Sequence, residues 1–236
     1  MALIELWYEL CLNAWPVMLK GLSYTLFYAI ASMLGGLALG LLIAIIRVTK
    51  VPMISFLASF YVSIIRGTPL LVQIFMIYYG ITPVIRAISA LYDLGLENFD
   101  ISATSAGIAA LSMNAAAYLS ESLRGGINGI SQGQWLAAQS LGFTWWQSMM
   151  RIILPQALRL AVPSMSNTLN SLIKDTSLLS VISVWELMMS AKEIISENMQ
   201  PFPIYLMIGL MYWVISFVFE RIQARIETRL EKAHTR

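Results

Sequence analysis

Four long stretches of the sequence contain no charged residue, and they set the pattern of the whole chain. These stretches cover residues 21–46, 67–85, 101–120 and 198–219. A helix crosses the hydrocarbon core of a bilayer with about 20 apolar residues. Because hydrocarbon offers no partner for backbone N–H and C=O groups, such stretches must fold as helices. The pattern therefore predicts an all-α integral membrane protein.

Polar residues and prolines between the apolar stretches divide the chain into about five transmembrane helices, within one domain over residues 20–222. The expected spans cover residues 21–46, 55–81, 101–121, 157–182 and 202–220. Residues 1–19 mix Trp, Leu and Glu, which favours an amphipathic segment lying in the membrane interface. A polar loop is expected over residues 86–100, and residues 223–236 are expected to form a polar cytoplasmic tail.

Composition supports a membrane protein and limits its chemistry. Only 12% of the 236 residues are charged, whereas a soluble domain carries about 25%. The single cysteine, Cys11, excludes an intrachain disulfide, and the single histidine, His234, lies in the polar tail. The sequence has no cluster with metal-ligand spacing and no GxxxxGKS/T motif, so we expect no metal, cofactor or catalytic residue in this chain. Any nucleotide chemistry must come from another chain, and no nucleic-acid partner is expected.

The distribution of basic residues indicates which way the chain crosses the membrane. Five spans place the two termini on opposite sides. If the N-terminus lies outside, the outer segments hold only three basic residues, Lys20, Arg86 and Lys192. The inner segments then hold ten, namely Arg47, Lys50, Arg124, Arg151, Arg159, Arg221, Arg225, Arg229, Lys232 and Arg236. The positive-inside rule therefore predicts an external N-terminus and a cytoplasmic C-terminus.

A long segment over residues 133–155 lies on the inner side in this topology and is less apolar than the spans. It reads GQWLAAQSLGFTWWQSMMRIILP, which predicts a short helix, a turn at Gly142, a second amphipathic piece, and Pro155 at the start of the fourth span. Gly142 permits a turn that a Cβ atom would hinder. Such a segment can be a rigid knob that a partner protein grips, or an interfacial helix that only seals the bundle.

The spacing within this segment resembles the EAA loop of ABC-importer permeases. The residues at matching places are Ala137, Ala138, Gly142, Ile152, Leu154 and Pro155. The family usually has Glu before the two alanines, where this chain has Leu136. The resemblance implies that the contact with a cytoplasmic ATPase is formed by Leu136, Ala137, Ala138, Gly142, Leu154 and Pro155.

Three further segments resemble those of the polar amino acid permeases within that family. They are RGTPLLVQ over residues 66–73, NAAAYLSESLRGGI over residues 114–127 and SLIKDTSL over residues 171–178. With the EAA-like segment they stand in the family's order, and the resemblance extends over residues 21–219. In the residues of these segments, the chain is most similar to the L-cystine permeases.

This resemblance implies a type I ABC-importer permease fold and a set of partners. The implied partners are two ATPase subunits that bind ATP and Mg, a second permease copy or a paralogue, with a homodimer favoured, and an extracytoplasmic amino-acid-binding protein. The chain would then be a non-enzymatic translocation subunit of the cell inner membrane. Its implied substrate is a polar amino acid, with L-cystine as the best guess.

Two charges stand inside the fourth expected span, at Lys174 and Asp175. A bare charge at the centre of a bilayer costs about 2.5–3.5 kcal/mol, so such a group normally pairs or lines a wet cavity. Asp175 is a candidate to bind the α-amino group of an amino acid, or it is a structural group that caps a broken helix. For Lys174 a structural contact with a carbonyl or a lipid phosphate is favoured.

Other polar residues in or near the spans are candidates for the substrate pathway. They are Arg66, Thr68, Gln73, Asn114, Tyr118, Glu121, Asn167 and Asn170. Arg66 and Thr68 belong to an interruption with Pro69, which lacks an N–H and should kink the second span. Glu121 and Arg124 are three positions apart, which favours an ion pair on one helix face. For the amides and Tyr118, hydrogen bonds between helices are the commoner role.

Two other classes of function fit part of the pattern. An ion-coupled secondary transporter would predict inverted repeats and paired titratable groups, and the sequence has neither. A membrane assembly subunit without transport activity would explain the spans and the surface segment. It would not explain Asp175 within a span or the interruption at residues 66–69.

Overall fold

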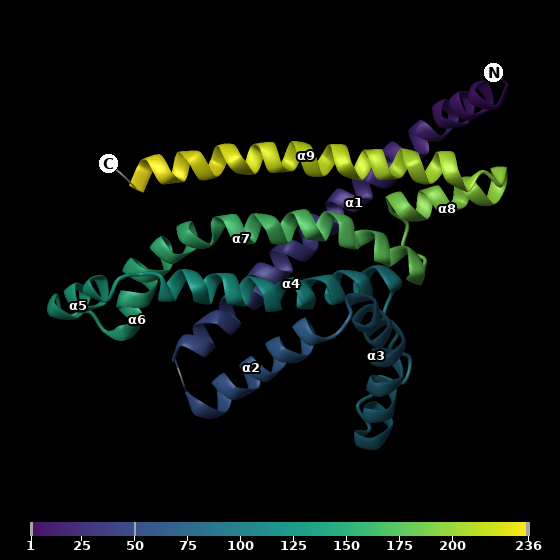
Figure 1. The fold of residues 1–236 in the computed structure, drawn as a ribbon. Coiled ribbons are helices and arrows are strands. Elements are labelled where there is room, and N and C mark those ends of the chain that lie inside the picture. The colour runs from purple at the N-terminus through teal and green to yellow at the C-terminus, as the bar shows by residue number, and fades with distance from the viewer. Residues whose placement is uncertain (1, 50, 235–236) are drawn as a thin grey trace.

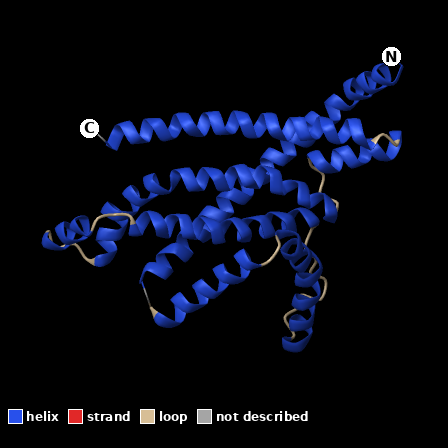
Figure 2. Ribbon diagram, viewed as in Figure 1, coloured by secondary structure: helices blue, strands red, loops and turns tan. Residues whose placement is uncertain are grey.

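The structure, a computed structural model, describes residues 2–49 and 51–234, and all of its regular elements are helical (Figures 1 and 2). In chain order they are α1 (Ala2–Thr49), α2 (Pro52–Gly67), α3 (Leu70–Tyr92), α4 (Ala103–Asn128), α5 (Gln132–Ser140), α6 (Trp145–Ser148), a π-helical turn (Met149–Ile153), α7 (Leu154–Asp175), a 3₁₀ helix (Thr176–Ile182), α8 (Leu187–Asn198) and α9 (Pro201–His234). The expectations for the side chains of Cys11, Lys50 and His234 lie outside the described residues.

The first helix is longer than the sequence pattern predicted. α1 continues through Pro16 without a break, so the interfacial segment expected over residues 1–19 and the first span form one helix. Packing explains this continuity. Ala14 and Met18, on either side of the proline, are buried in one apolar cluster with residues of α8 and α9. These contacts hold the helix on both sides of the hydrogen bond that Pro16 cannot make.

The interruption at residues 66–69 separates two helices rather than kinking one. Thr68 is extended, with φ −121° and ψ 147°, because the ring of a following proline disfavours helical backbone. Figure 1 shows α2 lying along the bundle and α3 pointing away from it. The structure therefore divides the single span expected over residues 55–81. It also extends α3 to Tyr92, so the loop expected from residue 86 begins at Asp93.

Among the described residues, three helical segments are long and apolar enough to cross a membrane: Leu12–Thr49, Leu70–Tyr92 and Pro201–Arg229. α4 and α7 correspond to the third and fourth expected spans. They are less apolar because polar side chains follow one face of each helix. α9 includes the fifth span and continues through most of the expected tail. The N-terminus and α8 lie toward one end of the molecule, and α5, α6 and the C-terminus lie toward the other (Figure 1).

Small residues let α4 pack closely at the centre of the bundle. A Cβ atom added to Gly36 of α1 would lie 2.8 Å from the Cβ of Ala115, and one added to Gly40 would lie 3.0 Å from the carbonyl oxygen of Ala116. In lipid, helices associate through such close packing because the hydrophobic effect does not drive them together. α4 therefore forms a rigid centre to which the polar side chains described below are attached.

Two neighbouring glycines of α4 provide a matched test of this packing. A Cβ at Gly126 would lie 2.5 Å from the backbone oxygen of Ala157 in α7, whereas a Cβ at Gly125 would meet nothing within 4 Å. We expect Gly126→Ala to destabilise the protein by about 1–3 kcal/mol through overpacking. Gly125→Ala should be neutral or stabilise by up to about 1 kcal/mol through helix propensity. Thermal unfolding in detergent measures both, and equal shifts would contradict the close α4–α7 contact.

Candidate functional site: a polar cavity and a helical knob

A cavity of about 810 Å³ lies between the α2–α3 junction, α4 and α7. Seven of the ten residues predicted for the substrate pathway line it, and they are Arg66, Thr68, Asn114, Tyr118, Glu121, Asn167 and Asp175. These residues come from three separate segments of the sequence. The fold thus brings most of the predicted polar residues to one place.

The other three predicted residues do not line the cavity. Gln73 is buried behind its wall, where its amide nitrogen donates to the carbonyl oxygen of Ile65 (2.8 Å) and its amide oxygen accepts from Asn114 (3.0 Å). Asn170 is also buried, and its amide nitrogen donates to Glu220 of α9 at 3.1 Å. Lys174 is exposed and lies outside the cavity lining. Gln73 supports the cavity wall, and Asn170 joins α7 to α9.

Four hydroxyl residues of the lining were absent from the sequence-based prediction. They are Ser122, Ser164, Thr168 and Ser171. The spacing of polar residues could have identified the three that belong to α7. Positions 164, 168, 171 and 175 follow each other at intervals of four, three and four, which places them on one face of α7. A single hydroxyl in a membrane helix carries little signal alone, but this stripe ends at Asp175 and is continuous.

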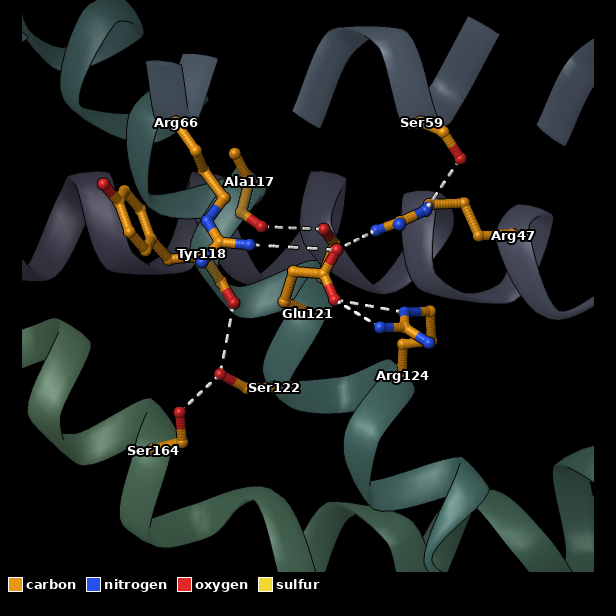
Figure 3. A network of polar contacts seen from close by, with 10 residues as sticks. Arg47, Ser59, Arg66, Ala117, Tyr118, Glu121, Ser122, Arg124 and Ser164 are labelled. Carbon is orange, nitrogen blue, oxygen red and sulfur yellow. Dashed lines mark hydrogen bonds and ion pairs between the residues drawn. The ribbon is translucent and has the colours of Figure 1, made fainter. Parts of the chain in front are cut away.

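A compact group of charges forms one part of the cavity wall (Figure 3). The predicted pair is confirmed, since Nη2 of Arg124 lies 2.7 Å from Oε2 of Glu121. Arg47 of α1 donates to the other carboxylate oxygen and also, through Nε, to Ser59 of α2 at 3.1 Å. Glu121 therefore links α4 to α1, and through Arg47 to α2. Sequence reasoning missed Arg47 because it stands 74 positions from Glu121.

Residues 132–154 form a helical knob that projects beyond the ends of α4 and α7 (Figure 1). It contains the predicted short helix, α5, and the predicted turn, where Gly142 has φ +80°. Thr144 then starts α6 with a capping box, because its side chain accepts from the N–H of Gln147 while the Gln147 side chain accepts from the N–H of Thr144. Pro155 lies in the first turn of α7, as predicted.

The knob has an anchored side and an exposed side. Leu154 belongs to a buried cluster with Ile127 and Met149, and Ala138 is also buried. Ala137 and Pro155 are exposed. Leu136 and Leu141 are exposed to 61% and 75%, so the knob presents apolar side chains to its surroundings. Leu141 was not among the residues predicted to contact an ATPase.

The described residues contain no group of three or more His, Cys, Asp or Glu side chains that could hold a metal ion. The site thus consists of the polar cavity and the knob described above.

Comparison with known proteins places this arrangement in a family. The profile of the family described as "Binding-protein-dependent transport system inner membrane component" matches residues 36–232. Among curated proteins, the chain is 40% identical to the L-cystine transport system permease protein TcyB of Bacillus subtilis (strain 168), over 92% of this chain and 88% of that protein. It is 37% identical to the probable amino-acid permease protein YxeN of the same organism, over 96% and 97% of the two chains.

A solved structure shares both fold and sequence with this chain. It is described as "Crystal structure of an amino acid ABC transporter with histidines" and matches with a TM-score of 0.79 and 32% identity, over 92% of this chain and 96% of that chain. The matches extend over the cavity-lining helices and the knob alike. The chain belongs to the family of inner-membrane components of binding-protein-dependent transport systems.

Proposed function

We propose that this chain is the permease subunit of an ATP-driven ABC importer that carries a polar amino acid across the inner membrane. The observation that supports this most is the polar cavity between α2, α4 and α7 in a chain of the transport family. The names of both curated relatives describe permeases for amino acids or L-cystine. Within this function L-cystine is the proposed substrate. The proposal is based on the similarity of the sequence segments to those of L-cystine permeases and on the 40% identity to TcyB.

Asp175 is proposed to bind the α-amino group of the substrate. It is the last residue of α7, where the backbone changes to a 3₁₀ helix, and it lines the cavity. A carboxylate within a membrane span normally faces a partner or a water-filled space. The hydroxyl groups of Ser171 and Thr168 lie on the same face of α7, so the substrate's amino group would meet hydrogen-bond acceptors around the charge.

The knob is proposed to couple the permease to its ATPase. Its anchored side packs against the ends of α4 and α7, so a push on the knob would reach the two helices that line the cavity. Exposed Leu136 and Leu141 offer an apolar contact, and Leu136 stands where the family usually has Glu before the alanines. In this proposal the N-terminus is external, and the knob and the C-terminus are cytoplasmic.

The proposed assembly contains two ATPase subunits, two copies of this permease and an external binding protein that delivers the amino acid. ATP binding closes the ATPase dimer and opens the permease pair outward, and hydrolysis resets it inward. The membrane chain supplies the pathway and the mechanical link, and its partner supplies ATP and Mg chemistry.

Radiolabelled uptake into proteoliposomes tests the function. The liposomes hold the permease, its ATPase and its binding protein with ATP inside, and the substrates compared are L-cystine, glutamine, arginine and histidine. Uptake that requires ATP supports the importer, and the preferred amino acid names the substrate. Uptake driven by a pH or sodium gradient without ATP would show a secondary transporter instead, and the absence of any uptake would favour an assembly role.

Asp175→Asn is the variant that tests the amino-group site. Asn keeps the size and loses the charge, so an ammonium group loses one charged hydrogen bond. Such a bond contributes about 1.5–3 kcal/mol, which corresponds to a rise in KM of about 10- to 100-fold. Asp93→Asn is the matched control, because Asp93 is exposed in the loop after α3 and Asn tolerates its left-handed backbone (φ 52°). Unchanged uptake by Asp175→Asn would remove Asp175 from the site.

A further inference from the structure

Arg66 occupies a special position among the charged residues of the cavity. It lies in the last turn of α2, just before the α2–α3 junction, and it lines the cavity. Its guanidinium carbon stands 5.3 Å from the centroid of the Tyr118 ring, which holds the group from one side. Its side chain is 46% exposed, the highest value among the arginines around Glu121. Figure 3 shows it between Tyr118 and Glu121.

The neighbouring carboxylate is already occupied by other arginines. Arg47 donates to Oε1 of Glu121, and Arg124 donates twice to Oε2, from Nε at 3.1 Å and from Nη2 at 2.7 Å. Nη1 of Arg66 is 4.0 Å from Oε1, which is beyond hydrogen-bond distance. Among the described residues, the guanidinium of Arg66 has no hydrogen-bond acceptor. One carboxylate thus faces three guanidinium groups, and the donors of Arg66 remain uncommitted beside the cavity.

The same cavity carries a negative group on another wall. Asp175 lines it from α7, while Arg66 lines it from α2. A molecule that satisfies both groups must carry a positive and a negative group and fit in this one cavity. A free α-amino acid has this pair of charges, because its ammonium and carboxylate groups are attached to one carbon atom.

We propose that Arg66 is the group that binds the α-carboxylate of the transported amino acid, in the same cavity as the amino-group site at Asp175. This proposal rests on the proposed function. It explains why the permease would select molecules with a free carboxylate. Guanidinium suits this task since its planar fork donates two parallel hydrogen bonds to a carboxylate. The contact with the Tyr118 ring restricts the guanidinium group, which lowers the entropy lost on binding.

The test compares each amino acid with its α-carboxamide, which keeps the amino group and loses the negative charge. The probes are L-cystine, glutamine, arginine and histidine with the corresponding amides. Equilibrium binding is measured on the purified permease–ATPase complex in nanodiscs, without the binding protein, since that protein selects its own ligand. The wild-type complex should bind the acid about 10- to 100-fold more tightly than the amide, as expected for a charged hydrogen-bonded pair.

Arg66→Gln should remove this discrimination. Its affinity for the acid should fall about 10- to 100-fold, and its affinity for the amide should change by about threefold or less, as for a surface substitution. Arg66→Lys should be intermediate, because Lys keeps the charge and loses the fork. Arg159→Gln is the matched control, since Arg159 is exposed on α7 outside the cavity lining and makes the same charge change.

Two results would overturn the proposal. One is a wild-type complex that binds the amides as tightly as the acids, which needs no variant and therefore no assumption about folding. The other is Arg66→Gln that retains the preference for the acid. In both cases ATP-driven amino-acid uptake by the wild-type complex would leave the proposed function standing. A wild-type complex that neither binds nor transports any of the four amino acids would remove both proposals together.

Discussion

Replacing Gly142 with Val is expected to reduce ATP-driven uptake by more than about tenfold while the permease still folds. Gly142 has φ +80°, and a Cβ placed there would meet nothing within 4 Å. Packing is therefore not the obstacle, and the backbone conformation is. The left-handed region costs an ordinary residue about 1–2 kcal/mol and is a rare conformation for a β-branched one. The introduced valine would draw the turn toward negative φ and change the angle between α5 and α6.

The measurement is uptake in the reconstituted system, together with ATP hydrolysis by the same liposomes. Gly142→Asn should retain much of the uptake, because Asn accepts left-handed backbone more readily than Val. Gly209→Val is a second control, since it adds the same side chain to a helical glycine with nothing within 4 Å of the added Cβ. Full coupled uptake by Gly142→Val would show that the shape of the knob does not transmit the motion.

Replacing Glu121 with Gln should destabilise the protein more than any other single charge removal in the cavity wall. The carboxylate accepts hydrogen bonds from Arg47 and Arg124 and lies 4.0 Å from Arg66. Without it, three positive groups from three helices remain together. The side chain of Glu121 is 22% exposed, so water reduces the penalty that a fully buried site would show. We expect a loss of about 2 kcal/mol, or about 5 °C in Tm.

Thermal unfolding of the purified protein, followed by tryptophan fluorescence, measures this effect. Glu197→Gln makes the same change at an exposed position in the last turn of α8 and should leave Tm unchanged. Arg47→Gln added to Glu121→Gln should recover part of the loss, because it removes one of the unbalanced charges, and the double-mutant cycle gives the coupling between the two residues. Additive losses would contradict the view that Glu121 acts by neutralising the arginines.

Several features of the fold and the site follow from short segments of sequence. The turn at Gly142 and the break before Pro69 depend on one or two residues, since glycine alone adopts positive φ freely and proline restricts its predecessor. The ion pair between Glu121 and Arg124 depends on spacing within one helix. The turn and the ion pair are confirmed, whereas at residues 66–69 the structure has a break between two helices where a kink in one span was predicted.

Predictions failed where packing between distant segments outweighs a local signal. The mixture of Trp, Leu and Glu over residues 1–19 suggested a separate interfacial segment, but contacts with α8 and α9 keep α1 continuous. A polar loop was expected from residue 86, yet α3 continues to Tyr92 because its backbone hydrogen bonds do not depend on the polarity of exposed side chains. Charge marks where a membrane helix leaves the hydrocarbon better than it marks where the helix ends.

The choice of which polar residues share the cavity also depended on the fold. Asn167 and Asn170 are three positions apart in α7 with the same side chain, yet Asn167 lines the cavity and Asn170 bonds to Glu220 of α9. Sequence spacing shows which residues share a face of one helix, but it does not show what that face meets. Arg47 reaches Glu121 from another helix, and no local pattern connects them.

The sequence by itself determined the helical membrane class, the knob and the family, because apolar length, backbone hydrogen bonding in lipid and local turn chemistry act over a few residues to a few turns. The tertiary structure alone decided that Arg66 and Asp175 face one cavity, that Arg66 has no hydrogen-bond acceptor among the described residues, and that α1 and α3 are longer than their polarity suggests. These features depend on how separate helices meet, and such contacts are set by the packing of the whole bundle.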